Sequence, residues 1–178
     1  MKRYIRGNEE YIFGMSVERG FLIGKLEGYA EVIFEHIMKI TVAQPTGNAK
    51  FIDKWIGDIG KAVFNSSKYT LDKNKRLDAE VYEQKLFASQ FGTTLQDMKY
   101  QLEDFKDDYA EYSNFEVSDE LAKILFGIVT DLRKLIPNMI AEHKGSNGIP
   151  IAHTKTQVRP IVRKYIDFKI GEENWRDQ

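Results

Sequence analysis

The sequence contains no cysteine, only four prolines and only three histidines. Without cysteine the chain forms neither disulfides nor thiolate metal sites, and we expect it in a reducing cytoplasm. No apolar run reaches the roughly 20 residues that a membrane-spanning helix needs. The charged N-terminus leads into no apolar signal segment. These absences favour a soluble cytoplasmic protein without a membrane partner.

Sequence motifs of metal and nucleophilic catalysis are also missing. His36, His143 and His153 occur in neither the Glu-x-x-His nor the His-Glu-x-x-His pattern that helical iron and zinc sites use, and we expect them at the surface. The nucleophile elbow G-x-S-x-G is absent too. The sequence therefore predicts no metal, no cofactor and no catalytic residue. A helical enzyme whose site is assembled in space would leave no motif, and it stays an alternative.

What the chain does contain is the hydrophobic spacing of helices. Its 178 residues are 42% hydrophobic and 30% charged, which is typical of a folded domain. Hydrophobic residues recur at intervals of three and four, the period of one helix face, in six segments: 17–40, 49–64, 72–90, 94–112, 118–136 and 158–166. We predict an all-α, single-domain irregular bundle of five or six helices.

Turn and linker residues divide the domain, 1–178, into parts. Residues 1–16 form an N-terminal arm, whose strand-favouring stretches "RYIR" and "YIFGMSV" allow a short β-hairpin. The helical core is 17–142, with a polar connector at 65–74. "HKGSNGIP", residues 143–150, is predicted to be a linker to the basic C-terminal segment, 151–178.

Several residues predict where individual helices end. Gly92 is expected to close the third helix, and Thr93 or Thr94 to cap the next one. Ser118 is expected to cap the fifth helix, whose first turn is acidic. Pro137 is expected to kink or end that helix, because proline lacks a backbone N–H.

Charge is distributed unevenly although the net charge is −1. Residues 97–120 carry nine acids and two lysines, whereas residues 144–169 carry six bases and one acid. Four of the acids fall together on one face of the predicted fourth helix: Asp97, Asp104, Asp108 and Glu111. This face is either a solvated surface or a docking surface for a basic partner.

The basic segment also allows more than one interpretation. Lys155, Arg159 and Arg163 recur at four-residue intervals, and Lys164 follows the last of them. On a helix they would form a cationic stripe that contacts nucleic-acid phosphates or an acidic partner, although Pro160 requires that helix to begin near Arg159. The same cations can instead pair with the acidic segment of this molecule or of a second copy.

Gly20, Gly24 and Gly28 recur at intervals of four, with Lys25 after the second. They do not form a phosphate-binding loop, because the spacing is one residue short and Leu26 replaces the required hydroxyl residue. On a helix they share one face, and each costs roughly 1 kcal/mol relative to alanine. We therefore predict close packing at this face, against another helix of the domain or against a second copy in a homo-oligomer.

The leading functional prediction is a non-enzymatic binding protein. It would be a small regulator or inhibitor that acts by contact with a macromolecular partner, in the first instance a protein. The alternatives are a nucleic-acid-binding module that uses the basic C-terminal segment and the helical enzyme described above.

Overall fold

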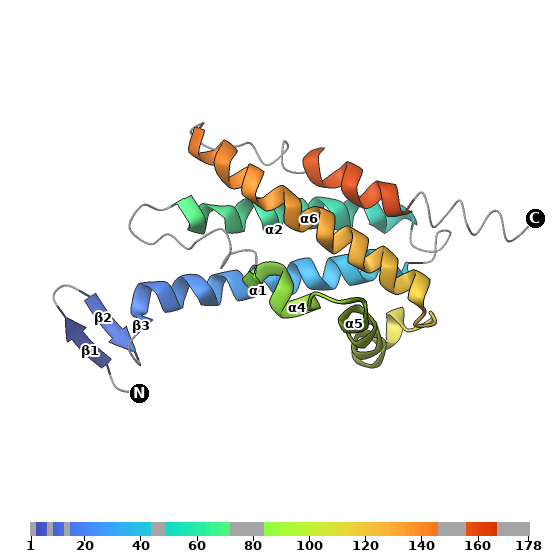
Figure 1. The fold of residues 1–178 in the computed structure, drawn as a ribbon, viewed down its shortest axis with the longest axis horizontal. Coiled ribbons are helices and arrows are strands. Elements are labelled where there is room, and N and C mark those ends of the chain that lie inside the picture. The colour runs from blue at the N-terminus through green and yellow to red at the C-terminus, as the bar shows by residue number, and fades with distance from the viewer. Residues whose placement is uncertain are drawn as a thin grey trace, which may run out of the picture.

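The computed structural model describes most of the backbone and a smaller set of side chains. The described backbone comprises residues 3–6, 9–12, 15–43, 49–71, 84–145 and 156–166, with side chains described within 24–43, 51–66, 84–135 and 156–166. Five helices of more than ten residues lie within these ranges, and they pack into an irregular bundle (Figure 1). The all-α prediction is confirmed.

Three short strands precede the first helix. β1 (Arg3–Arg6) pairs antiparallel with β2 (Glu9–Ile12), which places Tyr4 opposite Tyr11. β2 in turn pairs antiparallel with β3 (Met15–Ser16). The hairpin that the N-terminal sequence allows thus corresponds to β1 and β2, and the strands lie beyond the N-terminal end of the first helix (Figure 1).

α1 (Val17–Val42) is the central helix of the bundle. Among its described side chains the predicted hydrophobic face is buried, and so are Met38 and Thr41 beside that face. They are covered because both α2 (Ala49–Leu71) and the π-helical turn η1 (Gln84–Ala88) pack against α1. The Thr41 hydroxyl donates a hydrogen bond of 2.8 Å to the carbonyl one turn earlier, which satisfies it inside the core.

α2 is longer than predicted. All five hydrophobic residues of its predicted face are buried: Ile52, Trp55, Ile56, Ile59 and Val63. The helix then continues to Leu71, so the polar connector predicted at 65–74 is wrong over residues 65–71. Serine does not end this helix, because the hydroxyl of Ser66 donates to the Val63 carbonyl at 3.0 Å.

The predicted third helix is described only at its C-terminal end. η1 is followed by α4 (Ser89–Phe91), which ends at Gly92 with a backbone φ of 74°. Glycine adopts this left-handed region without the cost that a side chain would add. The predicted C-terminal cap at Gly92 is confirmed, whereas residues 72–83 of the predicted helix lie outside the described residues.

α5 (Leu95–Asp108) is followed by a 3-10 turn, η2 (Ala110–Tyr112), and packs mainly on α6. Three residues of its predicted hydrophobic face are fully buried: Met98, Leu102 and Phe105. Leu95 at the first position is 40% exposed. The helix ends at Asp108, so the last part of the predicted 94–112 helix is wrong, and Tyr109 lies at its C-terminal cap.

α6 (Asp119–Gly145) begins at the predicted cap, where the Ser118 hydroxyl accepts from the Leu121 N–H at 3.1 Å. It crosses α1 and α2 (Figure 1) and continues through Pro137, so the helix does not end there. Packing of its apolar face outweighs the roughly 3 kcal/mol that an interior proline costs. The predicted linker 143–150 is wrong at its first three residues, which are helical.

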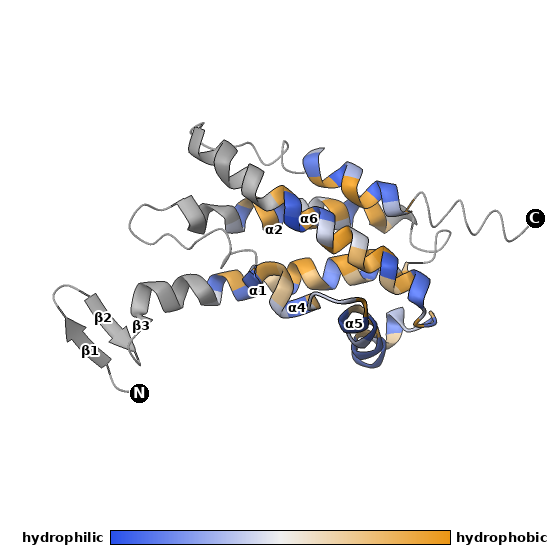
Figure 2. Cartoon of the chain, in the orientation of Figure 1, coloured by the Kyte–Doolittle hydropathy of each residue, from blue (hydrophilic) through white to orange (hydrophobic). Residues whose placement is uncertain are grey.

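Residues 156–166 form the last described helix. Its hydrophobic residues Val158, Val162 and Ile166 belong to the same buried cluster as the core of α1 and α2. Figure 2 shows many hydrophobic residues along α1, α2 and α6, whereas α5 is mainly hydrophilic. Charged side chains are thus displayed around a common apolar centre.

Candidate functional site

Asp97, the first of the predicted acidic residues, belongs to a helix cap. The Thr94 hydroxyl accepts from the Asp97 N–H at 3.1 Å, and the Asp97 carboxylate accepts from the N–H of Thr93 at 3.0 Å and of Thr94 at 3.1 Å. The bonds from Thr93 and then from Thr94 lower the pKa of the Asp97 carboxyl. Asp97 thus belongs to the capping box at the start of its helix. At the rise of an α-helix it lies about 17 Å along the helix axis from Asp108.

We expect Thr94→Ala to lower the free energy of unfolding by about 1 kcal/mol at pH 7, because the alanine removes the acceptor for the Asp97 N–H. The lowered pKa of Asp97 means that its capping contribution is present above the ordinary carboxyl range and is lost as the pH falls through the lowered value. Urea denaturation at pH 7 measures the loss in Thr94→Ala.

Thr93→Ala is the control for this prediction, because Thr93 contributes its backbone N–H and not its side chain to the cap. We expect no more than about 0.5 kcal/mol from this exposed change. Equal losses in the two variants would contradict the assignment of the cap to Thr94.

The other three predicted acids lie at the C-terminal end of α5. Asp104 and Asp108 are exposed on α5, and Glu111 is exposed on η2. Within the described part of the chain, none of these carboxylates forms a hydrogen bond or an ion pair. We call these three residues the acidic surface.

α1 places two further carboxylates, Glu31 and Glu35, beside the acidic surface. Burial raises the pKa of the Tyr109 phenol most, and the charges of Glu35 and Glu31 raise it further. Lys39 opposes this rise, and Asp108 adds a smaller increase. Carboxylates from α1 and from the end of α5 thus act on the same phenol. Glu31 and Glu35 could not be identified from the sequence, because their proximity to α5 arises only in the tertiary structure.

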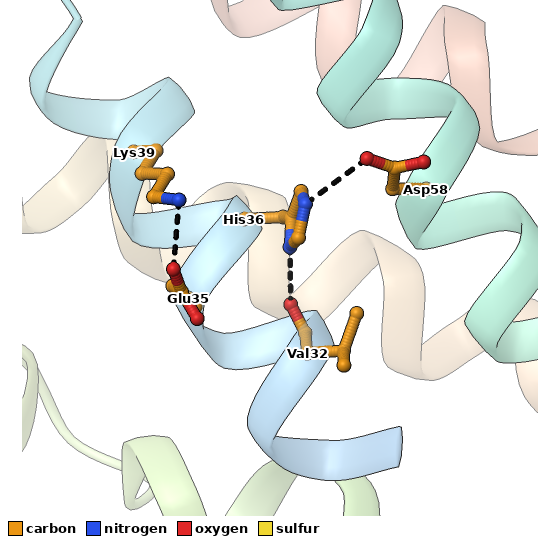
Figure 3. A network of polar contacts seen from close by, with 5 residues as sticks. All are labelled: Val32, Glu35, His36, Lys39 and Asp58. Carbon is orange, nitrogen blue, oxygen red and sulfur yellow. Dashed lines mark hydrogen bonds and ion pairs between the residues drawn. The ribbon is translucent and has the colours of Figure 1, made fainter. Parts of the chain in front are cut away.

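Lys39 lies among these carboxylates. Its ammonium is 2.7 Å from the Glu35 carboxylate (Figure 3) and lies over the Tyr112 ring, 5.3 Å from the centroid. Burial lowers the pKa of Lys39, but the bond to Glu35 and the charges of Glu35, Tyr112 and Glu111 outweigh it and raise the pKa. Lys39 therefore stays protonated and neutralises Glu35, which leaves Glu31 as the unneutralised neighbour from α1.

His36 links α1 to α2 (Figure 3). Its Nδ1 is 2.7 Å from the Val32 carbonyl oxygen, and its Nε2 is 3.1 Å from Oδ2 of Asp58. The His36 side chain is 16% exposed. The expectation of a surface histidine is wrong here, because the helix face that carries it turns toward α2. No sequence motif indicates the link, since the two partners are 22 positions apart.

The basic segment is paired within the molecule. Arg163 Nη2 donates to Oδ1 of Asp53 on α2 at 2.6 Å, and Lys164 Nζ is 3.9 Å from Oδ2 of Asp131 on α6. The Tyr165 hydroxyl donates to Asp131 at 2.8 Å. Burial, this bond and the Asp131 charge raise the pKa of Tyr165 to about 12. Intramolecular pairing is therefore present, but its partners lie outside the predicted acidic segment.

The predicted cationic stripe is interrupted by these pairs. The last helix begins at residue 156, before the predicted start near Arg159, and Pro160 lies within it. Arg159 is exposed on this helix, whereas Arg163 is bonded to Asp53. Lys155 lies outside the described residues. Arg163 and Lys164 of the predicted stripe thus form ion pairs within the molecule.

Gly24 and Gly28 face open space. Both are exposed, and no heavy atom lies within 4 Å of the position that a β carbon would occupy at either residue. The structure therefore shows no close packing within the chain at these two positions, because α1 turns its opposite face to the core. The surroundings of Gly20 lie outside the described side chains. Packing of this face between two copies stays a prediction.

Three further findings concern metal binding, membrane crossing and similarity to known proteins. Among the described residues, no group of three or more histidine, aspartate and glutamate side chains lies close enough together to hold a metal ion. No helix in the described ranges is both long enough and apolar enough to cross a membrane. Comparison with known proteins finds no matching family model, no match among curated proteins and no matching solved structure.

Proposed function

We propose that this chain is a non-enzymatic binding protein, a small regulator or inhibitor whose acidic surface docks on a basic region of a protein partner. The observation that carries the proposal is that Asp104, Asp108 and Glu111 are exposed and form no hydrogen bond or ion pair among the described residues. Glu31 on α1 extends the negative charge beyond α5.

The two lysines of α5, Lys99 and Lys106, interact with groups outside the acidic surface. Lys99 forms an ion pair with Asp119 at the start of α6. Lys106 donates to the Phe115 carbonyl at 2.6 Å and lies over the Phe115 ring, 5.4 Å from its centroid. Neither lysine of α5 therefore neutralises the acidic surface. Like charges held together destabilise a fold slightly, and a partner of opposite charge would relieve that repulsion.

The backbone and the rings beneath the acidic surface hold it in a defined shape. Tyr109 stacks on Phe105 with centroids 4.5 Å apart, and its N–H donates to the Phe105 carbonyl at 2.9 Å. The Tyr112 N–H donates to the Tyr109 carbonyl, also at 2.9 Å. A surface that is ordered before binding loses less conformational entropy when the partner docks. This rigidity supports recognition rather than mere solvation.

The proposal is tested by reversing the charge of the acidic surface with Asp104→Lys, Asp108→Lys and Glu111→Lys together. The wild-type chain, immobilised, should retain a stoichiometric protein partner from its native cell, and the purified partner is then titrated by surface plasmon resonance. Because like charges across an interface cost several kcal/mol, we expect the triple variant to bind at least about tenfold more weakly. The association rate of the wild type should fall as salt rises.

The matched control keeps the charge and changes only side-chain length, with Asp104→Glu, Asp108→Glu and Glu111→Asp. We expect it to retain the salt-dependent association of the wild type. Equal affinity of the wild type and the lysine variant would contradict the acidic docking surface. Binding of the chain to DNA or RNA in a gel-shift titration, weakened by salt, would instead favour the nucleic-acid alternative, against which the Arg163–Asp53 pair weighs.

A further inference from the structure

A cation is already bound at the edge of the acidic surface, and it belongs to the chain itself. The Lys39 ammonium lies 2.7 Å from the Glu35 carboxylate (Figure 3) and 5.3 Å from the centroid of the Tyr112 ring. A carboxylate and the face of an aromatic ring are groups that bind ammonium and guanidinium ions in proteins. Glu35 and Tyr112 together therefore bind a cation, and we call them the cation-binding pair.

The cation-binding pair adjoins the acidic surface. Tyr112 follows Glu111 in η2, and the charge of Glu111 acts on the Lys39 ammonium. Glu35 lies on α1, and Lys39 follows it one turn later on the same helix. The pair thus lies where the negative surface of α5 and η2 would continue onto α1 if Lys39 carried no charge.

Lys39 holds this position against cations from outside the molecule. Its side chain is 15% exposed and that of Glu35 is 31% exposed, so only part of this ion pair meets solvent. Because Lys39 is attached to the same helix as Glu35, its effective concentration at the carboxylate exceeds what a separate molecule reaches. A cation of a docking partner must therefore compete with one that is always present.

We propose that Lys39 is an internal competitor of the partner's cations, an inference that rests on the acidic docking surface proposed above. Lys39 occupies the cation-binding pair and ends the docking surface at η2. A partner then places its cations against the acidic surface, and Glu35 contributes nothing to docking. Without the Lys39 charge, an arginine or lysine of the partner reaches Glu35 and Tyr112, and docking becomes tighter. Lys39 thus sets how far the docking surface extends.

The test compares Lys39→Met with Lys99→Met in the full chain. Methionine keeps an unbranched side chain and removes the charge, so both variants lose one positive charge. Lys99 is the matched control, because it pairs with Asp119 at the start of α6 and lies outside the cation-binding pair. The probe is a labelled octa-arginine peptide, whose binding is followed by fluorescence anisotropy at 50 and 150 mM NaCl.

At 50 mM NaCl we expect Lys39→Met to bind the peptide about three- to tenfold more tightly than the wild type, and Lys99→Met to differ from it by less than about twofold. The gain should shrink at 150 mM NaCl, because salt screens exposed charges. An equal gain in the two variants would show that net charge alone acts, and would overturn the proposal. Unchanged affinity in Lys39→Met would overturn it too.

Glu35→Gln acts in the opposite direction and keeps the proposal falsifiable if circular dichroism shows that Lys39→Met does not fold. The amide has the length of glutamate but no charge, so the Lys39 charge is no longer neutralised beside the acidic surface. We expect peptide binding to weaken about threefold at 50 mM NaCl. In a Lys39→Met background the same change removes the carboxylate that the peptide would reach, and affinity should return close to that of the wild type. Unchanged affinity in Glu35→Gln, or a double variant that binds as tightly as Lys39→Met, would contradict the role of Lys39.

The triple variant Asp104→Lys, Asp108→Lys and Glu111→Lys separates this inference from the proposed function. Weaker peptide binding by the triple variant, together with unchanged binding by Lys39→Met, would leave the acidic docking surface in place and overturn only the role of Lys39. Peptide binding by the triple variant that equals that of the wild type would overturn both proposals.

Discussion

Phe105→Ala is expected to lower the free energy of unfolding by about 3–5 kcal/mol, the cost of truncating a buried phenylalanine. Phe105 is 1% exposed and stacks on Tyr109, with a second ring, Tyr112, tilted toward it at 6.3 Å. The alanine leaves a cavity beside Tyr109 and Tyr112 and removes the support of the η2 turn. Tyr109 and Tyr112 lie beside the acidic surface. We therefore expect Phe105→Ala to change the shape of the acidic surface as well.

Urea denaturation monitored by tryptophan fluorescence measures this loss, because the ring of Trp55 lies edge-on to Tyr112 at 6.2 Å. The matched control is Tyr100→Ala on the same helix, because Tyr100 is 56% exposed and its loss should change stability by no more than about 0.5 kcal/mol. Phe105→Leu, which keeps most of the volume, should cost less than about 1.5 kcal/mol. Similar midpoints for Phe105→Ala and Tyr100→Ala would show that α5 is not anchored through Phe105.

The helical core was predictable from the sequence because burial and hydrophobic period have the same cause. Ile52, Ile59 and Val63 recur with the period of one helix face, and that face of α2 is buried. Local capping was predictable for a similar reason, since Thr94, Ser118 and the glycine after α4 act on the backbone within a few residues of themselves. The signal and the structure it specifies lie in the same short segment.

Features that depend on the approach of distant segments could not be predicted in this way. The pairing of Arg163 with Asp53 spans 110 positions, and no property of either residue identifies the other. The same holds for His36 and Asp58. Two helix ends were also placed too early, because α2 continues past Ser66 and α6 continues past Pro137. Of the four acids that the sequence placed on one face, Asp97 serves its own helix cap.

The glycines show most clearly why spacing alone does not identify a packing site. The regular set on α1 has open space at Gly24 and Gly28, whereas the isolated Gly127 on α6 lies directly beneath the Tyr165 ring. A β carbon at Gly127 would overlap that ring closer than any van der Waals contact. Close approach of another helix is therefore found at Gly127, a glycine without a periodic pattern, because the partner helix comes from the far end of the chain.

Gly127→Ala and Gly28→Ala are consequently expected to change stability in opposite directions. Alanine at Gly28 meets no neighbour and should stabilise the helix by up to about 1 kcal/mol. Alanine at Gly127 gains the same propensity but displaces the Tyr165 ring and its 2.8 Å bond to Asp131, with an expected net loss of about 1–2 kcal/mol. A loss at Gly28 would instead indicate that this face packs against a second copy of the chain.

A double-mutant cycle separates displacement of Tyr165 from any other effect at Gly127. In a Tyr165→Ala background the ring is gone, so Gly127→Ala should become stabilising and approach the gain expected at Gly28. The coupling between the two positions should be about 1–3 kcal/mol, read from urea midpoints at an unchanged denaturant slope. Additive effects would mean that the last helix does not dock through Tyr165. Its buried residues Val158 and Val162 would then hold it on α2 and α6 without the contact at Gly127.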